Sequence, residues 1–120
     1  MEKLTTQEED AMQAAWKTGE ANIKSVLENM TDPKPPYTTL ASTIKNLEKK
    51  GFLIGRQLGN MFLYSPVVKE EEYKKKFMNT VVKNYFENSY KELVAFFAKE
   101  KKISATELKE IIEIIENKKV

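Results

Sequence analysis

The sequence predicts a mainly α-helical protein with one small β-hairpin, and two patterns carry this prediction. Through most of the 120 residues, apolar side chains recur three and four positions apart, which is the spacing of an amphipathic helix. The exception is 52–64, where two strand-forming segments flank a turn at Leu58-Gly59-Asn60. With 41% hydrophobic and 32% charged residues, the composition is that of a folded chain and not of a disordered one.

Two short helices are expected before residue 31. Thr6 and Glu9 have the spacing of a capping box, so a first helix is expected over about 5–17. Asn22 is a suitable cap for a second helix. Apolar residues at helical spacing give this second helix a stripe that faces the core, namely Ile23, Val26, Leu27 and Met30.

A third helix is expected over about 37–50. Three prolines within 33–36 separate it from the second helix, because proline cannot continue a helix. Gly51 is a suitable residue to end it. One face of this helix is apolar, with Leu40, Ile44 and Leu47. The opposite face is small, polar and basic, with Thr38, Ser42, Lys45, Asn46 and Lys49. The hairpin strands follow at about 52–57 and 61–64.

Three helices and then a hairpin is the order of a winged helix-turn-helix, in which the third helix enters the major groove of DNA. Charge supports this interpretation. Segment 34–66 holds five cations and one acid, a net charge of +4, whereas segment 1–33 has a net charge of −4. A basic excess gathered on one helix and the hairpin after it is typical of a polyanion-binding face. The sequence therefore predicts a DNA-binding domain over 1–66.

The polar face of the third helix supplies the candidate DNA contacts. Short hydroxyl and amide side chains fit a groove and bond base edges, while lysine and arginine neutralise phosphates. We expect base or near-base contacts from Thr38, Thr39, Ser42, Lys45 and Asn46. We expect phosphate contacts from Lys49, Lys50 and Arg56. The alternative interpretation is a solvated helix face, and for Arg56 a plain hairpin with a solvated side chain.

Residues 67–120 are expected to form a helical dimerisation domain. Three short amphipathic helices follow one another, the last opening with a capping box from Ser104 to Glu107. Such helices have little to bury against within one chain, so a second copy is expected to cover them. The expected dimer interface is Phe77, Val81, Tyr85, Leu93, Phe97, Leu108, Ile111, Ile112 and Ile115.

The absence of cysteine and histidine argues against most catalytic and metal chemistry. We expect no catalytic residue, no metal, no cofactor and no small-molecule substrate. The acidic cluster Glu8-Glu9-Asp10 is explained by its place at a helix N-terminus, where anions complement the helix dipole. No apolar run reaches the ~20 residues of a membrane span, and the N-terminus lacks a signal-peptide layout, so a cytoplasmic protein is expected.

The chain resembles the family of penicillinase and methicillin-resistance repressors (the BlaI/MecI type) over nearly its whole length. The order and spacing of several short groups carry the resemblance: Leu4-Thr5, Met12, Trp16, Gly19-Glu20, Tyr37-Thr38-Thr39, Leu47, Lys49-Lys50-Gly51, Gly59, Tyr64-Ser65-Pro66, Glu72-Tyr73 and Leu93-Val94. The resemblance implies a homodimeric winged-helix transcriptional repressor on a palindromic double-stranded DNA operator, often over antibiotic-resistance genes. It also implies relief through a membrane-bound sensor metallopeptidase, which causes cleavage in the dimerisation domain.

Two positions depart from the family pattern. Asn46 stands where the family usually carries arginine, so the operator sequence or the affinity is expected to differ. The family's Asn-Phe cleavage pair falls on Phe96-Phe97, which keeps the phenylalanine and loses the asparagine. The absence of cysteine excludes the copper-responsive branch. The alternative function is a winged-helix protein-interaction module, which predicts weak DNA binding without sequence preference.

Overall fold

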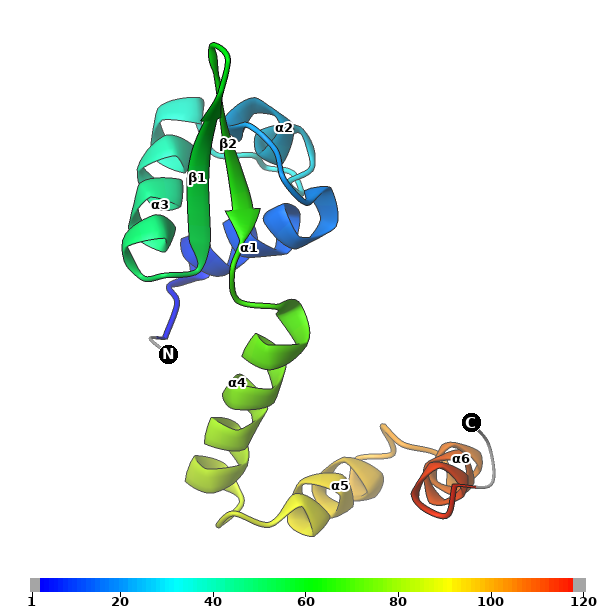
Figure 1. Cartoon of the computed structure of the whole chain (residues 1–120). Coiled ribbons are helices and arrows are strands. Elements are labelled where there is room, and N and C mark those ends of the chain that lie inside the picture. Colours follow the sequence, from blue (N-terminus) through cyan, green and yellow to red (C-terminus); the bar gives the residue numbers. More distant parts are fainter. Residues whose placement is uncertain (1–2, 118–120) are drawn as a thin grey trace. The chain divides into compact units, whose positions relative to one another are not determined.

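A computed structural model describes residues 3–117, which form six α-helices and one antiparallel hairpin (Figure 1). The elements are α1 (Thr6–Thr18), α2 (Ile23–Glu28), α3 (Tyr37–Lys49), β1 (Leu53–Leu58), β2 (Met61–Pro66), α4 (Glu70–Tyr85), α5 (Tyr90–Lys99) and α6 (Ala105–Ile115). The predicted class, mainly α with a winged helix-turn-helix and a further helical region, is confirmed. No helix within the described range is long and apolar enough to cross a membrane.

The cap of α1 corrects the predicted capping box by one residue. Thr5, and not Thr6, is the cap: the Glu8 backbone N–H donates to Thr5 Oγ1 at 3.2 Å, and the Thr5 N–H donates to Glu8 Oε1 at 2.8 Å. Glu9, the predicted partner of Thr6, instead accepts a hydrogen bond from the Tyr73 hydroxyl at 2.7 Å. The sequence allows either box, because Thr5 and Glu8 have the same spacing as Thr6 and Glu9; the structure has the first, and Glu9 contacts Tyr73 instead. The predicted cap of α2 is confirmed, since Asn22 Oδ1 accepts from the Ser25 N–H at 2.9 Å.

The hairpin pairs Leu53 with Pro66 at its base and Leu58 with Met61 at its tip. Gly59, at the first position of the two-residue turn, has φ of +61°, a value that glycine adopts without strain. The sequence pattern did not reveal a third, one-residue strand. Ala21 exchanges both backbone hydrogen bonds with Tyr64, at 3.0 and 2.8 Å, and so ties the segment before α2 to β2.

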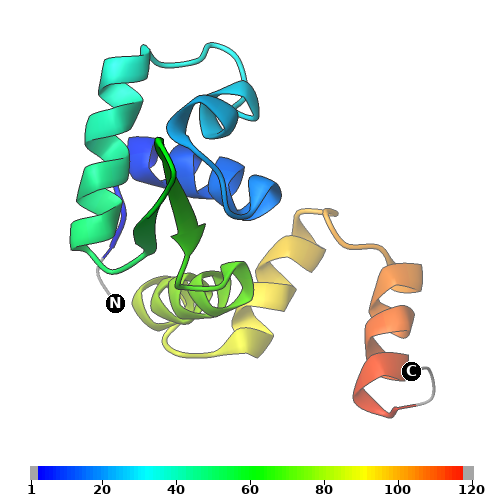
Figure 2. The same ribbon diagram turned by 45° about the horizontal axis from the view of Figure 1, so that its top comes forward.

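The core of the first compact unit lies where α1, α2 and α3 pack together beside the hairpin (Figures 1 and 2). Its largest fully buried side chains are Phe52, Met12, Leu40, Ile44, Leu47 and Val26. Trp16 lies at the edge of this core, and its indole N–H donates to the Val68 carbonyl at 2.9 Å. The predicted apolar faces of the first three helices therefore do meet.

The first unit continues past the hairpin into α4. By compactness the chain divides into Met1–Lys74 and Lys75–Val120, eight residues beyond the domain boundary expected after Pro66. The Tyr73 ring explains the difference, because it lies 5.9 Å from the Trp16 ring and 5.8 Å from the Phe52 ring. Burial, together with the hydrogen bond to Glu9, raises the pKa of Tyr73 to about 12, so its hydroxyl stays a donor near neutral pH.

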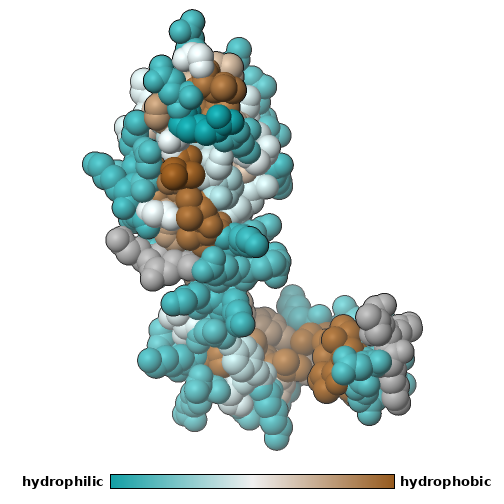
Figure 3. Space-filling model, in the orientation of Figure 1, coloured by the Kyte–Doolittle hydropathy of each residue, from teal (hydrophilic) through white to brown (hydrophobic). Residues whose placement is uncertain are grey.

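The second unit comprises the rest of α4 with α5 and α6, and it is poorly buried. The predicted capping box of Ser104 and Glu107 is confirmed. Among the described residues of this unit, only Val82 is fully buried. Large apolar side chains are exposed along all three helices (Figure 3): Phe77, Met78, Tyr85, Tyr90, Val94, Phe96, Phe97, Ile111, Ile112, Ile114 and Ile115.

We predict that a fragment ending at Lys74 unfolds at a higher urea concentration than one ending at Pro66. The shorter fragment loses the Tyr73 ring, its bond to Glu9 and the Val68 acceptor of Trp16. The expected difference is roughly 2–4 kcal/mol, since truncating a large packed ring costs about that much. Trp16, the only tryptophan, reports unfolding by fluorescence. Tyr73→Ala in the longer fragment should remove most of the gain, and equal midpoints for the two fragments would contradict the prediction.

Candidate nucleic-acid interface

Helix α3 separates a buried apolar face from an exposed polar one. Leu40, Ile44 and Leu47 are at most 1% exposed, which fixes the rotation of the helix. The opposite side chains are exposed and lie on one face: Thr38, Ser42, Lys45, Asn46 and Lys49. The structure thus brings together five of the eight residues expected to contact DNA.

Thr39 lies at the border of this face. It is half-buried, and its backbone carbonyl accepts a hydrogen bond from Thr43 Oγ1 at 3.0 Å. Thr39 and Thr43 also line an open hollow of about 570 Å³ between α1 and the loop that precedes α3. Thr39 is therefore less available to a groove than its neighbour Thr38.

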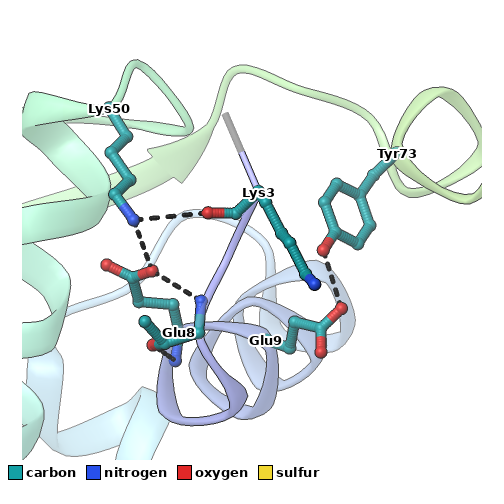
Figure 4. A network of polar contacts seen from close by, with 6 residues as sticks. Lys3, Glu8, Glu9, Lys50 and Tyr73 are labelled. Carbon is teal, nitrogen blue, oxygen red and sulfur yellow. Dashed lines mark hydrogen bonds and ion pairs between the residues drawn. The ribbon is translucent and has the colours of Figure 1, made fainter. Parts of the chain in front are cut away.

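Lys50 lies apart from the exposed face and is directed toward α1. Its ammonium is 2.7 Å from Glu8 Oε1 and 3.5 Å from the Lys3 carbonyl oxygen (Figure 4). Burial raises the pKa of the Glu8 carboxyl, since Glu8 is only 4% exposed, but the bonds from Lys50 and from the Thr5 N–H outweigh burial and leave this pKa below its ordinary value. The Lys50 charge is thus neutralised within the fold.

Arg56 of β1 is also paired within the fold. Its guanidinium forms two hydrogen bonds with Glu20, at 2.6 and 2.7 Å, and the Ser65 hydroxyl donates to the same carboxylate at 3.0 Å. The Arg56 guanidinium, followed by Ser65, lowers the pKa of Glu20 to about 2. The sequence shows Glu20 and Ser65 only as part of the family pattern and not as neighbours of Arg56, because residues 36 and nine positions away leave no periodic signal.

Lys45 is one of the α3 residues that contact the hairpin. Its ammonium lies 5.3 Å from the centre of the Phe62 ring and 5.7 Å from that of Tyr64, and 3.8 Å from Glu48 Oε1. The Tyr64 side chain is the main cause that raises the pKa of Lys45. The sequence places Phe62 in a strand and Tyr64 in a strand and in the family pattern, but it gives no sign that either ring lies beside Lys45.

Ion pairs within the first unit therefore neutralise part of the positive charge that the sequence assigns to segment 34–66. Lys50 and Arg56, from the segment with net charge +4, are neutralised by Glu8 and Glu20, from the segment with net charge −4. Lys49, by contrast, has no ion-pair partner among the described residues. Among the cations of segment 34–66, all of which lie in the described part of the chain, Lys49 on the exposed face of α3 is therefore the one without an ion pair.

Comparison with known proteins connects this geometry to one family. The chain matches the family model described as penicillinase repressor over residues 4–117. It is 23% identical to the penicillinase repressor of Bacillus licheniformis, over 98% of this chain and 92% of that protein. It is also 23% identical to the methicillin resistance regulatory protein MecI of Staphylococcus aureus (strain N315), and 24% identical to that of Mammaliicoccus sciuri. Each of these two matches covers 97% of this chain and 95% of the relative. The similarity thus spans both compact units.

We predict that Lys50→Ala destabilises the first unit by roughly 2–3 kcal/mol at neutral pH, because it leaves a buried carboxylate without its cation. Since the folded-state pKa of Glu8 is lowered, the pair contributes stability above the ordinary value of 4.5 and loses it as the pH falls through the folded-state pKa. Urea unfolding between pH 7 and pH 3 measures both effects. The pH dependence should be weaker in Glu8→Gln than in the parent chain, and equal curves would show that the pair contributes nothing.

Proposed function

The chain belongs to the penicillinase repressor family, whose members are transcriptional repressors and not enzymes, and we propose that it acts as a homodimer on a palindromic operator in double-stranded DNA. The observation that carries the proposal is the exposed polar face of α3. Its short hydroxyls at Thr38 and Ser42 precede the longer donors Lys45, Asn46 and Lys49, as a helix entering a groove about 12 Å wide requires.

The proposed roles of the eight candidate residues follow from their environments. Thr38, Ser42, Lys45 and Asn46 contact bases, with Thr39 at the edge of the interface, and Lys49 neutralises a phosphate. Lys50 and Arg56 have carboxylate partners of their own. Their proposed part is to hold α3 and the hairpin in place, and any contact they make with phosphate is secondary.

Poor burial of the second unit supports the homodimer. A unit in which Val82 is the only fully buried side chain among the described residues lacks the core that a small domain needs. A second copy would supply that core. The proposed interface is Phe77, Val81, Tyr85, Leu93, Phe97, Leu108, Ile111, Ile112 and Ile115, all at least partly exposed here.

The relatives' names guide the proposal for regulation. They are a penicillinase repressor and methicillin resistance regulatory proteins, and we place the target genes in the same class of antibiotic resistance. Relief of repression would follow from proteolysis or disruption of the second unit, with a membrane-bound sensor metallopeptidase as the proposed partner. Phe96 and Phe97, the proposed cleavage region, are 49% and 40% exposed on α5.

One observation favours the alternative function, a protein-interaction module. The outer face of the hairpin carries Ile54, Leu58 and Met61, each about half exposed or more, and Figure 3 shows apolar patches on the first unit. Apolar side chains beside a paired arginine are unlike a phosphate-binding wing. This surface suits a protein partner better than DNA.

Selection from a random pool of DNA duplexes with the full chain tests the proposal. We expect an enriched two-fold symmetric motif whose half-sites lie about one helical turn apart, because a dimer presents two α3 helices to successive major grooves. A protein that is folded and dimeric but enriches no motif would refute operator binding and favour the interaction module.

The two neighbouring lysines at the end of α3 give a matched test of the interface. Lys49→Ala should weaken binding to all sequences and lower the slope of log affinity against log salt by about one for each protomer. Lys50→Ala should leave this slope unchanged once the folded fraction is taken into account, because Glu8 already neutralises it. The reverse result would place Lys50, and not Lys49, in the interface.

A further inference from the structure

The ammonium of Lys45 lies close to two aromatic rings and one carboxylate on the surface of α3. The Phe62 and Tyr64 rings of β2 lie 5.3 and 5.7 Å away, and Glu48, one turn further along α3, lies 3.8 Å away. Aromatic ring faces and a carboxylate each attract a cation. Lys45 is therefore restrained, although its side chain is 58% exposed.

The Phe62 and Tyr64 rings form an aromatic platform beside Lys45, and Gly55 leaves room for it. Gly55 lies opposite Tyr64 in the hairpin. A Cβ at this position would lie 2.4 Å from Cε1 of Phe62, 3.0 Å from Cε1 of Tyr64 and 3.1 Å from Glu48 Oε2. The two rings, 5.3 Å apart, occupy the space that a side chain at position 55 would take. The hairpin is thus shaped to bring both rings toward α3.

Phe62 serves this platform more than the core. Its side chain remains 43% exposed, whereas Tyr64 is only 4% exposed. An aromatic ring left open on a small domain gains little from burial. Its clearest contact across elements is with the Lys45 ammonium.

Restraint changes what a lysine can recognise. A free lysine samples many rotamers and can follow any phosphate, which carries no sequence information. A lysine held in one position loses less freedom on binding and can distinguish the guanine acceptors O6 and N7 from other base edges. Lys49 provides the contrast within the same helix, since it is exposed and has no ion-pair partner among the described residues.

We propose that Lys45 is a specificity-determining contact of the operator, and that Phe62 and Tyr64 of the hairpin are its positioning residues. The proposal rests on the proposed operator binding and adds to it that two lysines of α3 have different roles. Lys45, held by the hairpin, selects a base pair, and Lys49 adds affinity without selection. The hairpin then sets specificity through α3, without itself touching the base.

The test measures affinities of the full-length protein for the selected operator and for all its single-base variants. Lys45→Ala should reduce discrimination about tenfold at one or two base pairs of each half-site. Lys49→Ala should weaken binding to all sequences equally. Phe62→Leu, which keeps apolar bulk but removes the ring face, should reduce discrimination about threefold at the same base pairs as Lys45→Ala. Phe62→Tyr, which keeps the ring face, should retain the parent's discrimination.

A double-mutant cycle separates positioning from a merely structural role. Adding Phe62→Leu to Lys45→Ala should cause no further loss of discrimination, because the residue being positioned is already gone. An additive loss, parental discrimination in Phe62→Leu, or a uniform loss in Lys45→Ala would each overturn the proposal. If a motif is enriched but Lys45→Ala leaves base preference unchanged, this inference fails and operator binding stands. If no motif is enriched, both fail.

Discussion

The ion pair between Glu8 and Lys50 is the contact on which the first unit depends. One carboxylate completes the cap of α1 through Thr5 and receives the lysine that ends α3, at 2.7 Å (Figure 4). A cation at the C-terminal end of a helix also complements the helix dipole. Gly51 follows at φ of +82° and turns the chain into β1. The adjacent residues Lys50 and Gly51 therefore fix both the packing of α3 against α1 and the start of the hairpin.

Pairing of this kind decides which of the predicted cations are free. Lys49 and Lys50 are adjacent and identical in type, yet about 100° apart on a helix, so one faces solvent and the other faces α1. The partners of Lys50 and Arg56 lie 42 and 36 residues away. Net charge along the sequence identifies the region that is basic. It cannot identify which cations form ion pairs within the fold, because ion pairing depends on contacts between distant segments.

The helices and the hairpin could be predicted because their signals are local. The predicted bounds of the first and third helices agree with α1 and α3 to within about one residue, and the caps at Asn22 and Ser104 formed as expected. The failures involve tertiary choices. Two overlapping capping boxes are possible at the start of α1; Thr5 and Glu8 form the one observed, while Glu9 contacts the distant Tyr73 hydroxyl. The bridge at Ala21 is one residue long, too short for any alternation to appear. The aromatic platform beneath Lys45 also depends on the register that sets Gly55 opposite Tyr64.

Each unit leaves a different kind of surface uncovered, and this difference bears on how repression could be relieved. The first unit has a filled core and an uncovered polar face on α3, which water solvates without penalty. The second unit has uncovered apolar faces, whose exposure is costly. Under the proposed function, the partner of the second unit is needed for stability, whereas DNA is optional for the first. Two half-sites joined in one dimer raise each other's effective concentration. Under this proposal, a signal that disrupts α5 or α6 would therefore release DNA without changing a single residue on the exposed face of α3.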